Sequence, residues 1–334
     1  MPASEITAVE TLILPADPLG IAEGAATLKR GGLVAFPTET VYGLGADAAN
    51  AAAIARLYQA KGRPTFNPLI AHVADVGAAR RIGRFDATAE RLAAAFWPGP
   101  LTLVVPQAAA CTVADLATAG LDTVAVRVPV HPTARALLAA FGGAVVAPSA
   151  NLSGHVSPTT AAHVAADLSG RIDLILDGGA VDVGVESTIV GCFAQPVLLR
   201  PGGVPSDAIA AVLGRPLARP STAEAHAPEQ QPLAPGMLAS HYAPRASVRL
   251  DATEVAPGEA LLAFGPVHVS GAAQAAATLN LSPSGDPAEA ATHLFGYLRA
   301  LDASGARSIA VMPIPNEGLG EAINDRLRRA AAPR

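Results

Sequence analysis

Short polar side chains follow two of the apolar runs that are typical of buried strands. Thr38 follows the run Leu33–Phe36, and Ser149 and Asn151 follow Ala144–Ala147. In α/β proteins, small ligands bind beyond the carboxyl ends of strands, where hydroxyl, amide and free backbone N–H groups converge. The same residue types also dominate ordinary turns. Taken singly, each segment is equally consistent with a ligand site and with a strand-to-loop turn.

Lys61 is one of only two lysines among 23 basic residues, the other being Lys29. Lys61-Gly62-Arg63-Pro64 has the composition of a helix C-terminus, with a cation in the last turn, then glycine and proline. That interpretation does not explain why a chain rich in arginine uses lysine here. A compact ammonium suits a phosphate group as a point charge, whereas a guanidinium favours bidentate contacts. We therefore favour a phosphate contact for Lys61.

Two further polar residues fall inside apolar runs. Arg127 lies within Val124–Val128, and a guanidinium in a buried strand needs a partner to offset its lost hydration. That partner could be an internal carboxylate, or the carboxylate or phosphate of a ligand. His72 lies within Leu69–Val73. On its own, it is more consistent with a hydrogen-bonded, half-buried histidine than with a catalyst.

The overall composition excludes several classes of protein. A net charge of −5 argues against a general nucleic-acid binder, which needs a basic excess to neutralise phosphates. Cys111 and Cys192 lie far apart, which rules out a disulfide scaffold or a cysteine-based zinc site and fits a reducing cytosol. The uncharged runs 92–114 and 136–166 are interrupted by proline and do not read as membrane spans. We expect a soluble, cytoplasmic protein with no membrane contact and no stable nucleic-acid contact.

The elements that must position these residues alternate between strand and helix through the first two hundred residues, as in an α/β domain. Helices are predicted where a capping residue opens an apolar-faced run and glycine or proline closes it. They fall at 18–29, 50–61, 87–96, 133–141, 160–168 and 207–213. Strands are predicted at 33–36, 69–73, 101–105, 124–128, 144–147, 174–176, 188–192 and 197–199.

The character of the sequence changes after residue 214. The segment 215–245 contains six prolines and no sustained period, which predicts a linker or a lid. Beyond it, a smaller α/β unit with a mostly parallel sheet is predicted. Its strands fall at 247–250, 261–264, 278–281 and 308–312, and its helices at 287–301 and 319–330. We therefore expect domains at 9–214 and 246–334, joined by the segment 215–245.

Taken together, six segments resemble the YrdC-like family in type and order. Its K-x-R and S-x-N elements are matched by Lys61-Gly62-Arg63 and Ser149-Ala150-Asn151. The other matching segments are Pro37–Leu44, Trp97–Thr102, Val126–Pro129 and Glu186–Thr188. Pro235-Gly236-Met237 and Ser240-His241-Tyr242-Ala243-Pro244 are similar to the two-domain form of the family. The resemblance covers nearly the whole chain. It implies a twisted mixed sheet with helices, then a linker and a smaller Rossmann-like α/β domain.

The resemblance also implies an activity, that of an L-threonylcarbamoyl-AMP synthase. Such a nucleotidyltransferase makes L-threonylcarbamoyl-AMP and pyrophosphate from L-threonine, bicarbonate and ATP, for the threonylcarbamoyladenosine modification of tRNA. The carbamate of N-carboxythreonine attacks the α-phosphorus, so catalysis rests on positioning and charge neutralisation, without a covalent nucleophile. Mg²⁺ is expected with ATP. The product is expected to pass to a tRNA-modifying transferase complex.

The family's functional residues carry over position by position onto this chain. The residues implied for the L-threonine site are Thr38, His72, Arg127 and Ser187. Those implied for the ATP site are Lys61, Thr123, Ser149, Ser157, Arg200 and Tyr242. The two signatures give a catalytic set of Lys61, Arg63, Ser149 and Asn151. The segment 215–245 would then be a lid, with Tyr242 reaching back to the first domain. Neither a general base nor a metal ligand is identified.

Two alternatives remain open. YrdC-like domains also occur in hydrogenase-maturation carbamoyltransferases, which resemble longer chains with an acylphosphatase-like region and cysteine zinc motifs. The length of 334 residues and the two isolated cysteines argue against that class. An RNA-binding module is disfavoured by the negative charge, although a local basic patch would escape a linear reading. The sequence indicates neither the oligomeric state nor the separate role of the second domain.

Overall fold

Ten strands from the first two hundred residues form one sheet in the order β1-β8-β2-β3-β7-β4-β6-β5-β9-β10. The structure is a computed structural model that describes residues 9–220 and 242–333. The sheet is mixed, since β4 pairs parallel with β6 whereas β3 pairs antiparallel with β7. The strands are β1 Leu12–Pro15, β2 Val34–Pro37, β3 Tyr42–Asp47, β4 Ile70–His72, β5 Leu101–Pro106, β6 Thr123–Arg127, β7 Val145–Val146, β8 Leu174–Asp177, β9 Thr188–Gly191 and β10 Val197–Arg200.

The first two helices of this unit begin and end where their capping residues predict. The side chain of Asp17 accepts a hydrogen bond from Gly20 N, and that of Asn50 accepts one from Ala53 N. Gly62 takes a φ of 60°, which favours glycine and ends the second helix after Lys61. The helices are α1 Pro18–Lys29, α2 Ala51–Lys61, α3 Val76–Ile82, α4 Ala87–Phe96, α5 Asp115–Thr118, α6 Pro132–Phe141, α7 Ala161–Leu168 and α8 Ser206–Leu213.

The strand β3 is an element that the sequence patterns did not predict. Its sequence, Tyr-Gly-Leu-Gly-Ala-Asp, contains two glycines, which are depleted in strands. A Cβ at Gly45 would lie 2.9 Å from both the Phe36 ring and the Val145 side chain. Tight packing between β2 and β7 therefore requires the glycine. The strand β1 and the helices α3 and α5 were also not predicted, and each is short or lies at an edge of the sheet.

The smaller unit contains a four-stranded, entirely parallel sheet in the order β11-β14-β12-β13. This confirms the predicted parallel character. Its elements are β11 Ser247–Arg249, β12 Ala260–Ala263, the short 3₁₀ helix η1 Ala272–Gln274, β13 Thr278–Asn280, α10 Pro287–Ala303, β14 Ser308–Val311 and α11 Gly320–Ala331. Most of the predicted linker lies outside the described residues, because 221–241 is not described. The lid and the boundaries at 214 and 246 therefore stay predictions.

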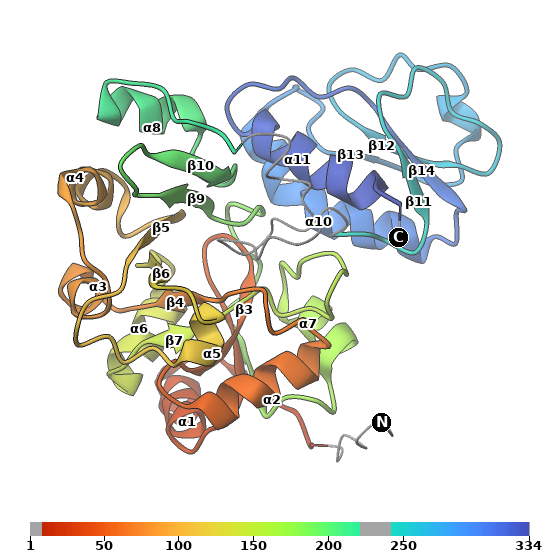
Figure 1. Ribbon diagram of the computed structural model, residues 1–334. Coiled ribbons are helices and arrows are strands. Elements are labelled where there is room, and N and C mark those ends of the chain that lie inside the picture. Colours follow the sequence, from red (N-terminus) through yellow and green to blue (C-terminus); the bar gives the residue numbers. More distant parts are fainter. Residues whose placement is uncertain (1–8, 221–241, 334) are drawn as a thin grey trace.

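The two units share a hydrophobic core. Phe295 and Leu298 of α10 belong to one buried apolar cluster with Val41, Val156 and Val185 of the larger unit. Figure 1 shows α10 and α11 on the side of the small sheet that faces the larger unit. Within residues 9–220 and 242–333, no helix has both the length and the apolar character to cross a membrane.

Candidate active site

A pocket lies over the middle of the large sheet, on the face opposite its largest core. Side chains alternate along a strand, so Ile70, His72 and Arg127 point into the pocket while Ala71 and Val126 pack into the core. His72 and Arg127 are paired across the neighbouring strands β4 and β6. The predicted site residues that line the pocket are Arg63, His72, Arg127, Ser149, Ser187, Arg200 and Tyr242.

Four further predicted residues lie behind this lining. Each is joined to the pocket wall by a hydrogen bond; they are Thr38, Lys61, Asn151 and Ser157. Thr123 is the exception. It lies at the start of β6, four residues before Arg127 and therefore about 13 Å away along the strand. Thr123 does not line the pocket, and its assignment to the ATP site stays a prediction.

Arg127 has an internal carboxylate partner, Glu39. Its Nη2 donates to Glu39 Oε1 at 2.6 Å, its Nη1 to Thr40 Oγ1 at 2.9 Å, and its Nε to the Gly99 carbonyl at 3.3 Å. Burial by itself would raise the pKa of Glu39, but the charge and hydrogen bond of Arg127 outweigh it, so the pKa is lowered. The carboxylate therefore stays ionised and fixes the guanidinium at the pocket wall.

His72 is held as a neutral imidazole. Its Nδ1 lies 3.2 Å from the carbonyl oxygen of Ile70, and the side chain is buried. Burial lowers the pKa of His72 to about 3, and the nearby charge of Arg127 lowers it further in the same direction. At neutral pH, His72 can therefore exchange hydrogen bonds with a ligand without adding a charge to the pocket.

Lys61 connects the two signature segments. It is the last residue of α2, and its Nζ donates to the Ser149 carbonyl at 2.5 Å and to the Asn151 carbonyl. Burial lowers the pKa of Lys61 well below its usual range, and the charge of Arg63 adds to the effect. In its protonated form Lys61 has three N–H donors, so the two carbonyls leave capacity for one anionic oxygen, and a bound phosphate would favour that form. The helix-end interpretation is correct for the backbone, and the side chain holds the Ser149–Asn151 turn.

Asn151 and Arg63 are the last residues of the two signature segments. The Nδ2 of Asn151 donates to the carbonyls of Leu152 and His155, whereas its buried Oδ1 has no partner within the described residues. Arg63 donates to the carbonyl of Pro68 at 3.0 Å, and burial lowers its pKa to about 10. Arg63 is therefore charged at neutral pH.

Glu186 is a pocket residue that the site prediction missed. Its Oε1 accepts a hydrogen bond from Ser157 Oγ at 2.5 Å, and its Oε2 pairs with Arg326 at 2.8 Å. The next residue, Ser187, accepts a hydrogen bond on its carbonyl from Arg200 Nη2 at 2.8 Å. Glu186 and Glu39 could have been found, because a carboxylate beside predicted site residues in a buried segment must have a cationic partner.

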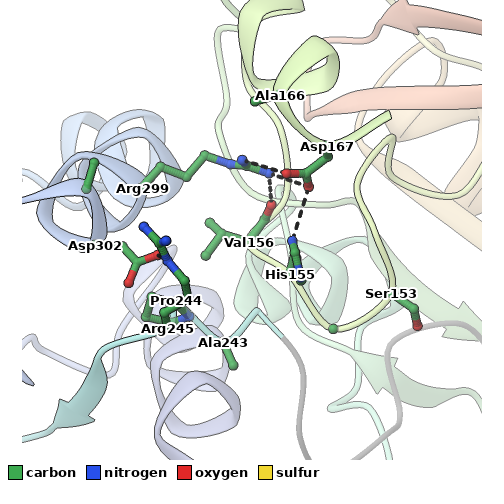
Figure 2. A pocket seen from close by; sticks show the side chains of 12 residues that line it. Ser153, His155, Val156, Ala166, Asp167, Ala243, Pro244, Arg245, Arg299 and Asp302 are labelled. Carbon is green, nitrogen blue, oxygen red and sulfur yellow. Dashed lines mark hydrogen bonds and ion pairs between the residues drawn. The ribbon is translucent and has the colours of Figure 1, made fainter. Parts of the chain in front are cut away.

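A larger hollow of about 640 Å³ lies nearby, between the two units. Figure 2 shows Arg299 of α10 reaching Asp167 of α7 and the carbonyl of Val156. The hydrogen bond from Arg299 Nη2 to Asp167 Oδ2 is 3.0 Å long. None of the predicted site residues lines this hollow. We therefore place the candidate active site in the smaller pocket, where the chemically active groups converge.

Comparisons with known proteins identify the family. Residues 26–202 match the family model Sua5_yciO_yrdC, described as "Telomere recombination", and residues 204–332 match "Threonylcarbamoyl-AMP synthase, C-terminal domain". The threonylcarbamoyl-AMP synthase of Bacillus subtilis is 40% identical over 94% of this chain and 93% of its own length. The chain belongs to the threonylcarbamoyl-AMP synthase family. The Pyrococcus abyssi enzyme of the same name is 41% identical over 92% of each chain.

A solved structure of the same family confirms the fold. The crystal structure of P. abyssi Sua5 complexed with L-threonine superposes with a TM-score of 0.85 at 37% identity, covering 97% of each chain. The predicted YrdC-like two-domain family and its mixed α/β fold are therefore both confirmed. Among the described residues, no group of three or more His, Cys, Asp or Glu side chains could hold a metal ion.

Proposed function

We propose that this protein synthesises L-threonylcarbamoyl-AMP and pyrophosphate from L-threonine, bicarbonate and ATP. As a nucleotidyltransferase it supplies the intermediate for threonylcarbamoyladenosine in tRNA and hands it to a tRNA-modifying transferase complex. One observation carries the proposal: a pocket with three buried or half-buried arginines and several hydroxyls, in a chain that aligns with threonylcarbamoyl-AMP synthases over more than nine-tenths of its length.

The Arg127 side of the pocket suits the carboxylate of an amino acid. A guanidinium has five N–H donors. Gly99, Thr40 and Glu39 take one each, which leaves two for the carboxylate of L-threonine. Neutral His72 and the neighbouring hydroxyls can accept or donate hydrogen bonds to the threonine side chain. Arg127 thus donates hydrogen bonds both to the carboxylate of Glu39 and to the carboxylate of the bound L-threonine.

Other cationic groups of the pocket suit the triphosphate. Lys61 contacts the Ser149–Asn151 turn, and Arg63 and Arg200 line the same pocket. In the reaction, a carbamate oxygen of N-carboxythreonine forms a bond to the α-phosphorus, and the bond to the pyrophosphate oxygen breaks. The buried cations stabilise the charge that develops on the phosphoryl oxygens and on the leaving pyrophosphate. Because the chemistry needs no covalent intermediate, no nucleophilic side chain is required.

Mg²⁺ enters, in this proposal, as part of the substrate MgATP. The two carboxylates at the pocket are each committed to an arginine, Glu39 to Arg127 and Glu186 to Arg326. The described residues thus offer no dedicated metal cage, and the triphosphate oxygens would supply most of the ligands. We assign no step of the reaction to a protein-bound metal.

The activity can be tested with the purified protein by measuring pyrophosphate release and identifying the product by mass spectrometry. We expect release that depends on both L-threonine and bicarbonate, with L-threonylcarbamoyl-AMP as the product. Omitting either substrate from otherwise identical reactions provides the control. Formation of AMP or pyrophosphate at the same rate without L-threonine would refute the substrate assignment.

A further inference from the structure

Arg326, on α11 of the C-terminal unit, is fully buried and contacts three separate parts of the pocket wall. Its Nε donates to Glu186 Oε2 at 2.8 Å, and its Nη1 donates to the Pro201 carbonyl, also at 2.8 Å. Its guanidinium lies 5.4 Å from the centre of the Tyr242 ring. Glu186 and Tyr242 line the pocket, and Pro201 directly follows Arg200, which also lines it. One C-terminal side chain therefore joins three segments that are distant in sequence.

A fully buried guanidinium is a costly way to pack a helix. Removing a charge from water costs several kcal/mol, and an apolar side chain of similar size often stabilises a core equally well or better. Arg326 is balanced by Glu186 and by Asp325, whose Oδ2 accepts from Nη1 at 2.8 Å. Its Nη2 nevertheless has no hydrogen-bond partner within the described residues. Packing alone does not account for an arginine at this position.

The contacts of Arg326 pass directly to predicted ATP-site residues. Glu186 is bonded to Ser157, and Arg200 is bonded to the carbonyl of Ser187, the residue after Glu186. A shift of Glu186 would therefore move Ser157 and Arg200 together. Arg326 also bonds the carbonyl of Pro201, the residue after Arg200, and so holds the chain on the C-terminal side of Arg200.

Tyr242 needs an external restraint of this kind. Its φ is 62°, a left-handed conformation that is unfavourable for a bulky residue and persists only where the surroundings enforce it. Two C-terminal side chains hold the ring: Phe295 stacks on it with centroids 5.4 Å apart, and Arg326 contributes a cation–π contact.

We propose that Arg326 is a positioning residue through which the C-terminal domain holds Glu186, Pro201 and Tyr242 in the arrangement that binds ATP. The inference rests on the proposed function in one respect, the identity of the nucleotide. It gives the C-terminal domain a specific part in the reaction, although none of the described residues 243–333 lines the pocket.

The test is the Arg326→Lys variant, which keeps the charge beside Glu186. A single ammonium cannot reproduce the planar fork that bonds Glu186 and Pro201 and faces the Tyr242 ring. We expect the Kd for ATP, measured by titration calorimetry, and the KM for ATP to rise about tenfold. The KM for L-threonine should rise less than the KM for ATP, because Arg326 bonds no threonine-site residue directly and reaches Ser187 only through Glu186 and Arg200. General destabilisation would lower the active fraction without separating the two KM values.

Arg329→Lys is the matched control, because Arg329 lies on the same helix and pairs with the same Asp325 at 3.1 Å. It should leave both KM values unchanged. An Arg326→Lys protein with a native Kd for ATP, or with equal rises in both KM values, would overturn the inference. If the native protein binds ATP but makes no threonylcarbamoyl-AMP, the proposed function fails, while the Kd comparison still tests Arg326.

A second pair of variants covers the case in which Arg326→Lys does not fold. Glu186→Gln together with Arg326→Met removes both charges of the buried pair, so neither is left uncompensated. Glu186→Gln alone is the reference protein. We expect the double variant to bind ATP at least about fivefold more weakly than Glu186→Gln. Equal ATP affinity in the two proteins would show that Arg326 has no positioning role.

Discussion

At the scale of single residues, burial changes the acid–base behaviour of two basic groups at the pocket. The pKa of His72 is lowered to about 3, and that of Lys61 is lowered well below its usual range. Both side chains are at most 2% exposed, so the loss of hydration is the main cause in each case. His72 can therefore be tested through the pH dependence of stability, and Lys61 through catalytic activity.

The shift at His72 predicts a pH-dependent stability. Between about pH 6.5 and pH 3, the unfolded chain binds a proton at His72 that the folded protein does not, so acidification favours unfolding. From pH 7 to pH 5, His72 should contribute a loss of about 2 kcal/mol to the free energy of unfolding. Urea denaturation of His72→Gln should show a loss smaller by that amount. The exposed His268, changed to Gln, is the control for the substitution itself.

The pH experiment has a clear negative outcome. If native protein and His72→Gln lose the same stability between pH 7 and pH 5, His72 is not held neutral in the folded state. The buried carboxylates Glu39 and Glu186 also have lowered pKa values. Their contributions are lost only at lower pH, near and below their ordinary range, so they do not obscure this window.

Lys61 provides the second residue-scale prediction. Lys61→Met keeps the length of the side chain but removes the donors to the Ser149 and Asn151 carbonyls. We expect kcat/KM for threonylcarbamoyl-AMP synthesis to fall about 100-fold or more, with an unchanged circular dichroism spectrum. Lys29→Met, at the exposed end of α1, is the control and should be fully active. Full activity of Lys61→Met would leave Lys61 only its role at the end of α2.

At the scale of elements, the pocket depends on close backbone contacts between segments. The segment after β10 passes directly against the segment before β9. A Cβ at Gly202 would lie 2.3 Å from the Glu186 carbonyl oxygen and 2.4 Å from the Thr188 nitrogen. These are backbone atoms, so no side-chain rotation can relieve the contact. Glycine at this position allows Arg200 and Ser187 to meet.

Gly202→Ala is therefore expected to be destabilising and inactive. The overlap should cost about 1–3 kcal/mol or more in urea denaturation, and it should displace Arg200 from the pocket. Gly296→Ala is the matched change on α10, where the nearest atom to a new Cβ is Thr159 Oγ1 at 3.9 Å. That variant should be fully active and up to about 1 kcal/mol more stable. An active, stable Gly202→Ala protein would contradict the packing argument.

At the scale of the whole molecule, the two units are joined by apolar contacts and by buried charge. Phe295 packs in one cluster with Val156 and Val185, Arg299 pairs with Asp167, and Arg326 pairs with Glu186. Such an interface resembles the interior of a domain more than the polar contacts typical of mobile domain pairs. The arrangement of the pocket therefore depends on the folded state of both units.

Scanning calorimetry should show one cooperative unfolding transition. Phe295→Ala should lower the stability of that whole transition by about 3–5 kcal/mol, because it opens a cavity in the shared core. Val267→Ala, at an exposed apolar position of the C-terminal unit, should leave it unchanged. Two separate transitions, only one of them shifted by Phe295→Ala, would show that the units fold independently.

The sequence by itself determined most of the regular elements and the family. Helices such as α1 and α2 were predictable because their caps are local: Asp17, Asn50 and Gly62 act within one turn of their own helix. The signature segments were recognisable because each is continuous along the chain. Most of the residues that line the pocket could be predicted for this reason.

Tertiary structure alone decided which groups meet. Glu39 lies 88 residues from Arg127, and Glu186 lies 140 residues from Arg326. The strand character of β3, with its two glycines, depends on the neighbours β2 and β7. Desolvation and charge pairing act between side chains that are close in space, whatever their separation in sequence. The ionisation states of the pocket residues are therefore determined only in the folded chain. The same holds for the contacts by which the pocket depends on the C-terminal unit.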